Sequence, residues 1–334
     1  MVNSCSVLFW VILLGGINLS FGSISWLGVW AGMEISLLGA YGIFCGTFTQ
    51  GEVVSTMKYL LIQVLSSGLV LMGFLMRDWS IMSGVLGELM VNLGIFMKVG
   101  VFPFYSWVAP VMLGLSWVAS WIFCTLQKIV PLMVFSVMLE YFAVLSDMCA
   151  LISVMVAGWE GMHQTSIRGI FAFSSIGQSG WLLLLCSRGD ASGMVWFSLI
   201  YSFVLMSVFW SILQYDPYNY INLSKEFMPS NLYKVYNVVT IFSLVGLPPL
   251  LGFIPKILVL SEVSVSLGFF TLVLLWAMLA SVWFYVSFLF CIMVESFSSY
   301  KMLYIDQVQK IKDFFIMLLF LIINSVGGIL YFML

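Results

Sequence analysis

Apolar segments long enough to cross a bilayer follow one another along most of this 334-residue chain. A bilayer core takes about 20 residues of helix, and only helices or closed barrels satisfy their backbone hydrogen bonds there. Counting apolar runs between polar residues predicts eleven spans: 5–22, 24–46, 54–76, 80–118 (long and interrupted), 119–139, 146–160, 169–187, 191–213, 235–261, 267–291 and 314–333. The expected fold class is all-α, a polytopic transmembrane helix bundle of about eleven helices.

Composition excludes several other classes of protein. Hydrophobic residues make up 63% of the chain and charged residues 8%, against roughly a quarter charged in soluble domains. A net charge of -2 offers no basic surface for nucleic acid. No two glycines lie two residues apart and no glycine precedes a lysine, so the chain lacks the dinucleotide-binding and P-loop glycine motifs.

The residues that usually bind metals or redox centres are too few or too dispersed. The only histidine is His163, which excludes haem held by paired histidines and any multi-histidine metal cage. The cysteines lie far apart, without zinc-site or iron–sulfur spacing: Cys5, Cys45, Cys124, Cys149, Cys186 and Cys291. We expect no metal, and no cofactor, in this chain.

Basic residues are distributed unevenly between the two sides of the predicted bundle. With the N-terminus on side A and the spans alternating, side A carries Lys58, Arg168, Lys225, Lys234, Lys301, Lys310 and Lys312, whereas side B carries Arg77 and Arg188. The positive-inside rule then places the N-terminus in the cytoplasm or mitochondrial matrix and the C-terminus opposite. Because no basic residue precedes Lys58, we expect no signal peptide or presequence, and the first helix stays as an anchor.

Four ionisable residues interrupt apolar runs: Glu34, Lys98, Lys128 and Lys256. A charge at the centre of a membrane helix costs about 2.5–3.5 kcal/mol on insertion scales, so such residues usually face protein or water and mark ion pathways. The alternative is a side chain near a helix end that extends to the headgroups. That alternative is weak for Glu34 and Lys128, which lie mid-run, and stronger for Lys98 and Lys256, whose spans are irregular.

Two of these lysines lie beside residues that break helices. Lys98 is followed by Gly100 and Pro103, and Lys256 is preceded by glycines and by Pro248, Pro249 and Pro255. Proline removes a backbone donor, and a broken membrane helix persists only where its freed carbonyls meet protein or water. One interrupted span in each half of the chain is typical of inverted-repeat transporters, whose ion sites lie at the breaks. Prolines that only shape packing are the alternative.

A row of buried amines could pass protons. Burial disfavours the charged form of a lysine and a nearby carboxylate favours it, so protonating or moving a partner such as Glu34 would load or unload a lysine. The hydroxyl and amide groups of Tyr105, Gln127, Ser174 and Ser175 are candidates for holding the waters between them. Glu34 lies on a different helix face from a stripe of four glycines, and both faces are expected to pack against protein. The stripe consists of Gly28, Gly32, Gly39 and Gly46.

Six motifs together resemble one family, the subunit 2 family of mitochondrial NADH dehydrogenase, which are antiporter-like membrane subunits of respiratory complex I. The motifs are WAGMEISLLG around Glu34, KYLLIQVLSS from Lys58, KVGVFPFYSWVAPV from Lys98, TLQKIVP around Lys128, HQTSIRGIFAFSSIGQSGW from His163, and GLPPLLGFIPK ending at Lys256. The resemblance covers nearly the whole chain, and the set in this order is highly specific.

The resemblance implies a role for each buried charge. Glu34 and Lys98 would form the charge pair, Lys128 would be the central relay lysine, and Lys256 the exit-side group. It also implies eleven helices in a single transmembrane domain: a five-helix repeat over about 1–140, a second over about 145–292, and a final helix over about 314–334. It further implies a multi-pass protein of the mitochondrial inner membrane, with the N-terminus on the matrix side and the C-terminus on the intermembrane-space side.

Two positions depart from the family pattern. Gln178 stands where the family commonly has histidine, and Tyr105 stands where PFH is usual. An amide can hold a water but cannot carry a proton, so a histidine step of the relay is in doubt here. Glu88 does not belong to the pattern and receives no role.

The leading hypothesis is a proton-translocating subunit of NADH:ubiquinone oxidoreductase, an enzyme complex in which other subunits would hold NADH, FMN, iron–sulfur clusters and ubiquinone. Its partners would be other membrane subunits, lipid, protons and water. A stand-alone cation/proton antiporter is the main alternative, because it would share the buried lysines and broken helices. A scaffold subunit ranks last, since four charges in apolar helices are costly without a function.

Overall fold

The computed structural model describes residues 4–46, 49–77, 81–139, 141–215, 231–264, 268–298 and 316–325, and these residues form helices joined by turns and short connections. The numbered helices are α1 (Ser4–Gly22), α2 (Trp26–Phe44), α3 (Gln50–Arg77), α4 (Ile81–Val99), α5 (Val108–Gly114), α6 (Trp117–Cys124), α7 (Leu126–Met138), α8 (Ala143–Met162), α9 (Ile167–Ser187), α10 (Ala191–Tyr215), α12 (Asn231–Val245), α13 (Phe253–Ser264) and α14 (Gly268–Ser298). A further short helix is Ile316–Ser325. The all-α prediction is confirmed.

The described residues form thirteen numbered helices, whereas the sequence predicted about eleven spans. Three predicted spans are each split in two: 80–118 gives α4 and α5, 119–139 gives α6 and α7, and 235–261 gives α12 and α13. Of the predicted final helix, 314–334, only Ile316–Ser325 lies within the described residues.

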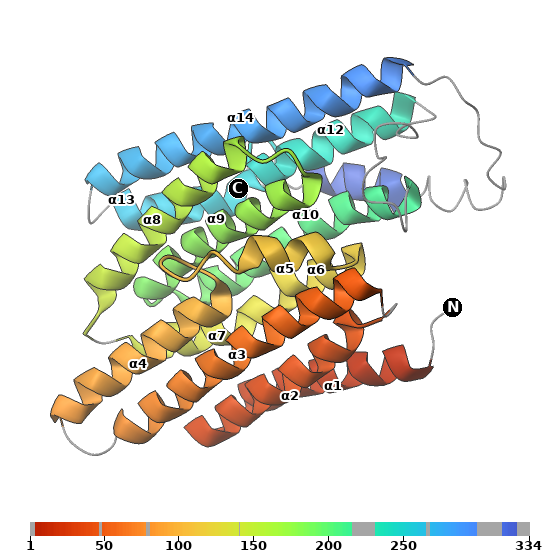
Figure 1. The fold of residues 1–334 in the computed structure, drawn as a ribbon. Coiled ribbons are helices and arrows are strands. Elements are labelled where there is room, and N and C mark those ends of the chain that lie inside the picture. The colour runs from red at the N-terminus through yellow and green to blue at the C-terminus, as the bar shows by residue number, and fades with distance from the viewer. Residues whose placement is uncertain are drawn as a thin grey trace.

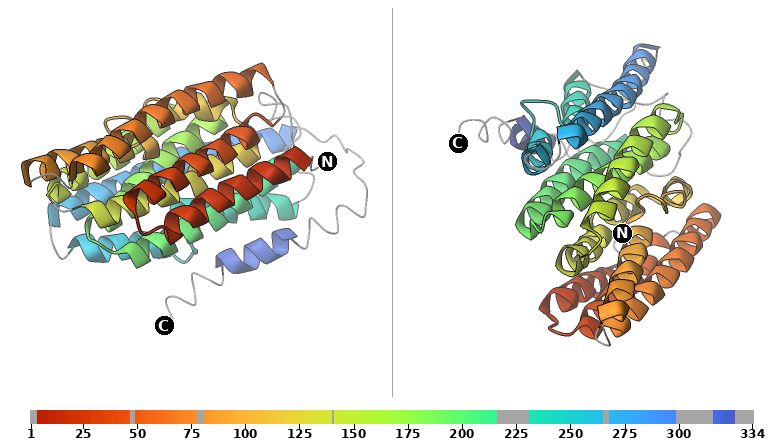
Figure 2. Two further views of the ribbon diagram at one scale, coloured as in Figure 1. Left: turned by 90° about the horizontal axis from the view of Figure 1, so that it is seen from below. Right: turned by 90° about the vertical axis from the view of Figure 1, so that its left-hand side faces the viewer.

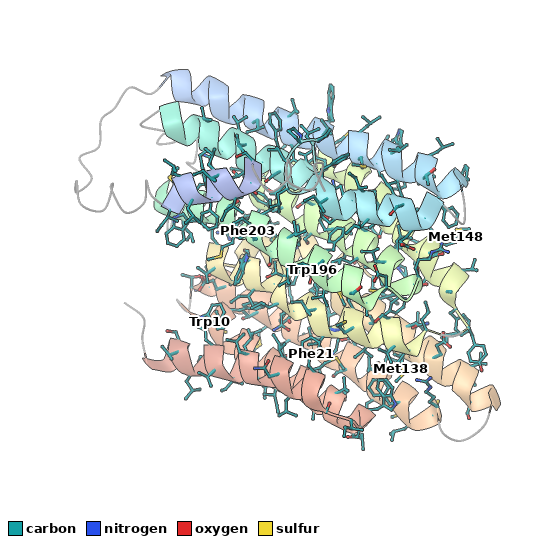
Figure 3. All side chains as sticks on the ribbon, turned by 180° about the vertical axis from the view of Figure 1, so that it is seen from behind. Trp10, Phe21, Met138, Met148, Trp196 and Phe203 are labelled. Carbon is teal, nitrogen blue, oxygen red and sulfur yellow. The ribbon has the colours of Figure 1, made fainter. Side chains whose placement is uncertain are left out.

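The long helices run side by side, with α1–α4 at one edge of the bundle and α12–α14 at the other (Figure 1 and Figure 2). Seven helical segments in the described ranges are long and apolar enough to cross a membrane. Apolar side chains such as Phe21, Met148 and Trp196 are exposed on the outside of the bundle (Figure 3). The apolar exterior and the long apolar helices identify a multi-pass membrane protein.

Glycines allow neighbouring helices to approach closely. A Cβ built at Gly39 of α2 would lie 2.5 Å from the backbone nitrogen of Leu13 in α1, and one at Gly32 would lie 2.6 Å from the nitrogen of Ser20. Two members of the predicted glycine stripe therefore pack against α1, as small residues do at membrane helix interfaces.

Helix α4 and helix α12 end in the same way, although Figure 1 shows them running in opposite directions. Gly100 and Gly246 have φ angles of 75° and 77°, a left-handed conformation that favours glycine. At each break the amides of the glycine and of the next residue donate to one carbonyl, that of Phe96 in α4 and of Phe242 in α12, at 3.0 to 3.3 Å. The prediction of two broken helices is confirmed.

The predicted helix-breaking prolines occupy two kinds of position. Pro103, Pro248 and Pro249 lie in the connections between the half-helices. Pro255 lies in the first turn of α13, where proline is tolerated because its missing amide would have no helical partner. Pro255 therefore starts the second half-helix, and the connection before it ends the first.

A third interruption, which the sequence analysis did not predict, separates α6 from α7 at Thr125. This residue has φ and ψ angles of -118° and -80°, and its hydroxyl donates to the carbonyl of Trp121 at 2.6 Å. Pro131 lies inside α7 and contributes no amide donor. Lys128 therefore lies on a short stretch of helix bounded by an irregular residue and a proline.

Glu88, which had no predicted role, caps the N-terminal end of α8. Its carboxylate, buried in the bundle, accepts hydrogen bonds from the amides of Tyr141 at 2.9 and 3.0 Å and of Phe142 at 3.1 Å. Phe142, the residue that precedes α8, makes no side-chain hydrogen bond to the helix. Glu88 thus supplies from α4 the acceptor that a helix N-terminus needs, and its negative charge suits that end of the helix.

Replacing Glu88 by leucine should lower the stability of the protein by about 1.5–3 kcal/mol, because the variant leaves these amides without their charged acceptor. The measurement is the thermal unfolding of the purified assembly. Glu88→Gln keeps one acceptor oxygen and should lose less. Glu262→Leu, at an exposed carboxylate of α13, controls for removal of charge, and an equal loss there would contradict the capping role.

The predicted orientation rests mostly on residues outside the described part of the chain. Lys225, Lys301, Lys310 and Lys312 lie there, as does the side chain of Lys234. Arg168, counted among the charges of connections and helix ends, lies at the start of α9 and is buried there. It donates to the carbonyls of Leu113 and Leu115, and its guanidinium lies 4.7 Å from the ring centre of Trp117. Orientation stays a prediction.

Candidate functional site

The three lysines predicted inside the membrane, Lys98, Lys128 and Lys256, are all buried in the bundle, on α4, α7 and α13. Each amine has at least one polar or aromatic partner, and the partners differ. Only Lys98 has an acidic partner among the ion pairs found in the described residues.

Lys98 pairs with Glu34 of α2, with its amine 3.4 Å from a carboxylate oxygen. The lysine side chain is 3% exposed and the glutamate side chain 25% exposed. Glu34 is therefore partly exposed, whereas the sequence predicted that its helix face packs against protein. Gln63 of α3 donates to the carbonyl of Lys98 at 3.1 Å, which fixes the last turn of α4 just before the break.

Lys128 donates from its amine to the carbonyl of Ser175 in α9 at 2.8 Å. Beside it, Gln127 accepts a hydrogen bond from the hydroxyl of Tyr59 at 3.2 Å and donates to the carbonyl of Ser36 at 3.2 Å. Gln127 thus joins α2, α3 and α7 with polar bonds. These bonds connect the surroundings of the Glu34 pair to those of the central lysine.

Lys256 lies in the first turn of α13, just after the break that separates this helix from α12. Its amine donates to the carbonyl of Val245, the last residue of α12, and lies 5.9 Å from the ring centre of Trp181 in α9. A Cβ at Gly246 would lie 2.9 Å from Cδ of Lys256. Gly246 therefore has two roles: it adopts the left-handed backbone conformation, and its lack of a side chain leaves room for the methylene groups of Lys256.

Two small cavities lie next to α9. The larger, of about 30 Å³, is lined by residues that include Ser174, Gln178, Lys256 and Tyr285. The smaller, of about 10 Å³, is lined by residues that include Gln178 and Tyr201. A water needs roughly 10–15 Å³ measured in this way and 2–4 polar partners. The larger cavity has the size and the polar walls for water.

The predicted water-holding residues lie in four different settings. Ser174 and Gln178 line a cavity, and Ser175 offers its carbonyl to Lys128 while its own hydroxyl donates to Ala172. Gln127 belongs to the polar bridge described above. Tyr105 instead donates to Glu160 of α8 at 2.9 Å, and the described residues show no hydrogen bond between it and the three lysines.

Several polar residues at the site were missed from the sequence. Tyr59 and Tyr201 lie in apolar runs, and Tyr285 and Trp181 do too. Aromatic residues with a polar atom are common at membrane surfaces. Their presence in an apolar run therefore does not show how deep in the membrane the side chain lies. Only the structure places them near the lysines.

The described residues contain no group of three or more His, Cys, Asp or Glu side chains that could hold a metal ion. The ionisable atoms of the site are three amines and one carboxylate. In the described geometry these groups can bind, hold and release protons.

Comparison with known proteins places the chain in a family. The model of the family "NADH:quinone oxidoreductase/Mrp antiporter, TM" matches residues 75–283. A protein of Anopheles gambiae named NADH-ubiquinone oxidoreductase chain 2 is 32% identical over 269 residues, 77% of this chain and 76% of its own. The chain belongs to the NADH-ubiquinone oxidoreductase chain 2 family. A chain 2 protein of Paracentrotus lividus is 31% identical over 85% of this chain and 83% of its own.

Solved structures share the fold of this chain 2 family member at low identity. A chain of respiratory complex I from Thermus thermophilus superposes with a TM-score of 0.82 at 17% identity, over 98% of this chain and 79% of its own. A chain of the Mrp complex from Dietzia sp. gives 0.74 at 16% identity, over 85% and 59%. The antiporter-like architecture predicted from the sequence is confirmed.

Proposed function

We propose that this chain is a proton-translocating membrane subunit of NADH:ubiquinone oxidoreductase in the mitochondrial inner membrane. Protons would pass along the buried lysines, with Glu34 as the partner of Lys98 and with water between the groups. The observation that carries the proposal is the arrangement around α9. This helix gives Lys128 its carbonyl partner and Lys256 its aromatic neighbour, and it lines the cavities.

The three lysines have roles suited to their positions. Lys98 faces a carboxylate, so the state of Glu34 sets how strongly the ammonium is stabilised there. Lys128 lies at the centre of the bundle, with a single carbonyl partner that does not compete for its proton. Lys256 accepts the proton next to carbonyl groups freed by the broken helix, the surroundings in which transporters commonly place ion sites.

The chain itself would hold no redox group. NADH, FMN, iron–sulfur clusters and ubiquinone would belong to other subunits, and the energy of their chemistry would reach this chain through its membrane neighbours. We also propose two repeats, about 1–140 and 145–292, followed by a final helix. The matching backbone hydrogen bonds at Gly100 and Gly246 support this division. The proposed orientation places the N-terminus in the matrix and the C-terminus in the intermembrane space.

Native electrophoresis of mildly solubilised membranes tests the proposal against a stand-alone cation/proton antiporter. We expect the chain to migrate in a large assembly together with NADH oxidation activity. When that assembly is purified and placed in vesicles, NADH oxidation should acidify one side of the membrane. A chain that migrates alone and exchanges cations for protons without NADH would overturn the proposal in favour of the antiporter.

A further inference from the structure

Tyr201 of α10 has a hydroxyl group that the described residues leave without a hydrogen-bond partner. The side chain is buried, and a buried phenol normally has a partner because an unsatisfied one costs about 1–3 kcal/mol. Tyr201 lines the smaller cavity, together with Gln178 and Ser243. Its volume of about 10 Å³ is near the roughly 10–15 Å³ that one water requires. A buried hydroxyl beside a cavity of this size is suited to binding water.

Tyr285 of α14 lines the larger cavity, as Tyr201 lines the smaller one. It is buried, and it lines that cavity with Lys256 and Gln178. Its hydroxyl also interacts with Ser174 of α9. Tyr285 thus brings a second phenol to the cavity that Lys256 also lines.

The two phenols connect the surroundings of two lysines. Lys128 donates to the carbonyl of Ser175, and the adjacent Ser174 lines the larger cavity with Tyr285 and Lys256. The two phenols therefore lie at the two cavities, Tyr285 with Lys256 at the larger one and Tyr201 at the smaller one. Gln178 lines both cavities, but an amide can only hold water and has no proton to exchange at neutral pH.

We propose that Tyr201 and Tyr285 carry the proton from Lys128 to Lys256, through water in the two cavities, past the amide of Gln178. The inference rests on the proposed function, because it describes one step of that relay. Each phenol can accept a proton on its oxygen while its own proton leaves on the other side. The Lys128 ammonium loses one proton, the Lys256 amine gains it, and both phenols and the intervening waters end the step neutral.

Phenylalanine substitutions in the assembled enzyme test the step. Tyr201→Phe removes an oxygen that has no protein partner in the described residues, so assembly and thermal stability should be kept. We expect it to lower the number of protons moved per NADH oxidised by as much as Lys128→Met does, and Tyr285→Phe to do the same. Tyr236→Phe is the matched control, since the hydroxyl of this buried tyrosine donates to the carbonyl of Ser207 at 2.7 Å, away from the cavities. It should leave the proton count unchanged.

The substitution Gln178→His provides a second test, in which the expected result is a gain of proton translocation. Gln178→His would add a group able to carry a proton between the cavities. In the Tyr201→Phe background it should restore proton translocation. If Lys128→Met lowers the proton count and both phenylalanine variants leave it unchanged, the tyrosine step is wrong and the relay stands. If Lys128→Met also has no effect, the proposed function itself falls.

Discussion

Replacing Lys128 by methionine in the assembled enzyme is expected to slow proton translocation at least tenfold, equivalent to about 1.4 kcal/mol of barrier. Methionine fills a similar volume, and the lost amine donated to a single carbonyl, that of Ser175, so assembly should be kept. The measurements are proton movement into vesicles and NADH oxidation by the same preparation.

Lys128→Arg separates proton transfer from charge. Arginine keeps a positive charge but does not release its proton in proteins, so it should block translocation as methionine does. Lys58→Met is the matched control, because Lys58 is an exposed lysine of α3. Normal translocation in Lys128→Met, with only assembly altered, would instead support a static scaffold.

Breaking the pair between Glu34 and Lys98 is expected to have the second largest effect. Glu34→Gln leaves a 3% exposed ammonium without its counter-ion, and removing one partner of a buried pair typically costs about 3–5 kcal/mol. We expect at least a tenfold loss of coupled NADH oxidation, with reduced thermal stability of the assembly.

A double-mutant cycle identifies the pair as the cause. Lys98→Gln removes the buried charge, so the double variant Glu34→Gln/Lys98→Gln should be more stable than Glu34→Gln alone. Contacting charges typically show coupling energies of about 0.5–3 kcal/mol in such cycles. Effects of the two substitutions that add independently would mean that the 3.4 Å contact has no energetic role. Glu262→Gln, at an exposed carboxylate, serves as the control.

The sequence predicted the fold well where local chemistry determines it. Glycine and proline have strong backbone preferences, so the breaks near Gly100 and Pro248 could be read from residue type alone. The third interruption could not, because Thr125 has no such preference and its distorted geometry depends on its surroundings. For that reason a single span, 119–139, was expected where the structure has α6 and α7.

The candidate site was predicted in part. A lysine in an apolar run is conspicuous, so all three amines were identified, and the structure buries them. Their roles stay predictions. The partners come from distant segments: Ser175 is 47 residues from Lys128, and Glu88 is 53 from Tyr141. Such pairings depend on how the helices pack, which a single sequence does not specify. The bond from Tyr105 to Glu160 is a further example that could not be predicted.

Helix α9 has a mechanical consequence for the two inner lysines. Its Ser175 carbonyl holds the amine of Lys128 and its Trp181 ring lies near that of Lys256, so one rigid rod contacts both. A Cβ at Gly180 would lie 2.4 Å from the hydroxyl of Ser153, so this rod is packed tightly against α8. Any rotation of α9 about its long axis would therefore change the surroundings of both amines in a single movement. The same rotation would also displace α8.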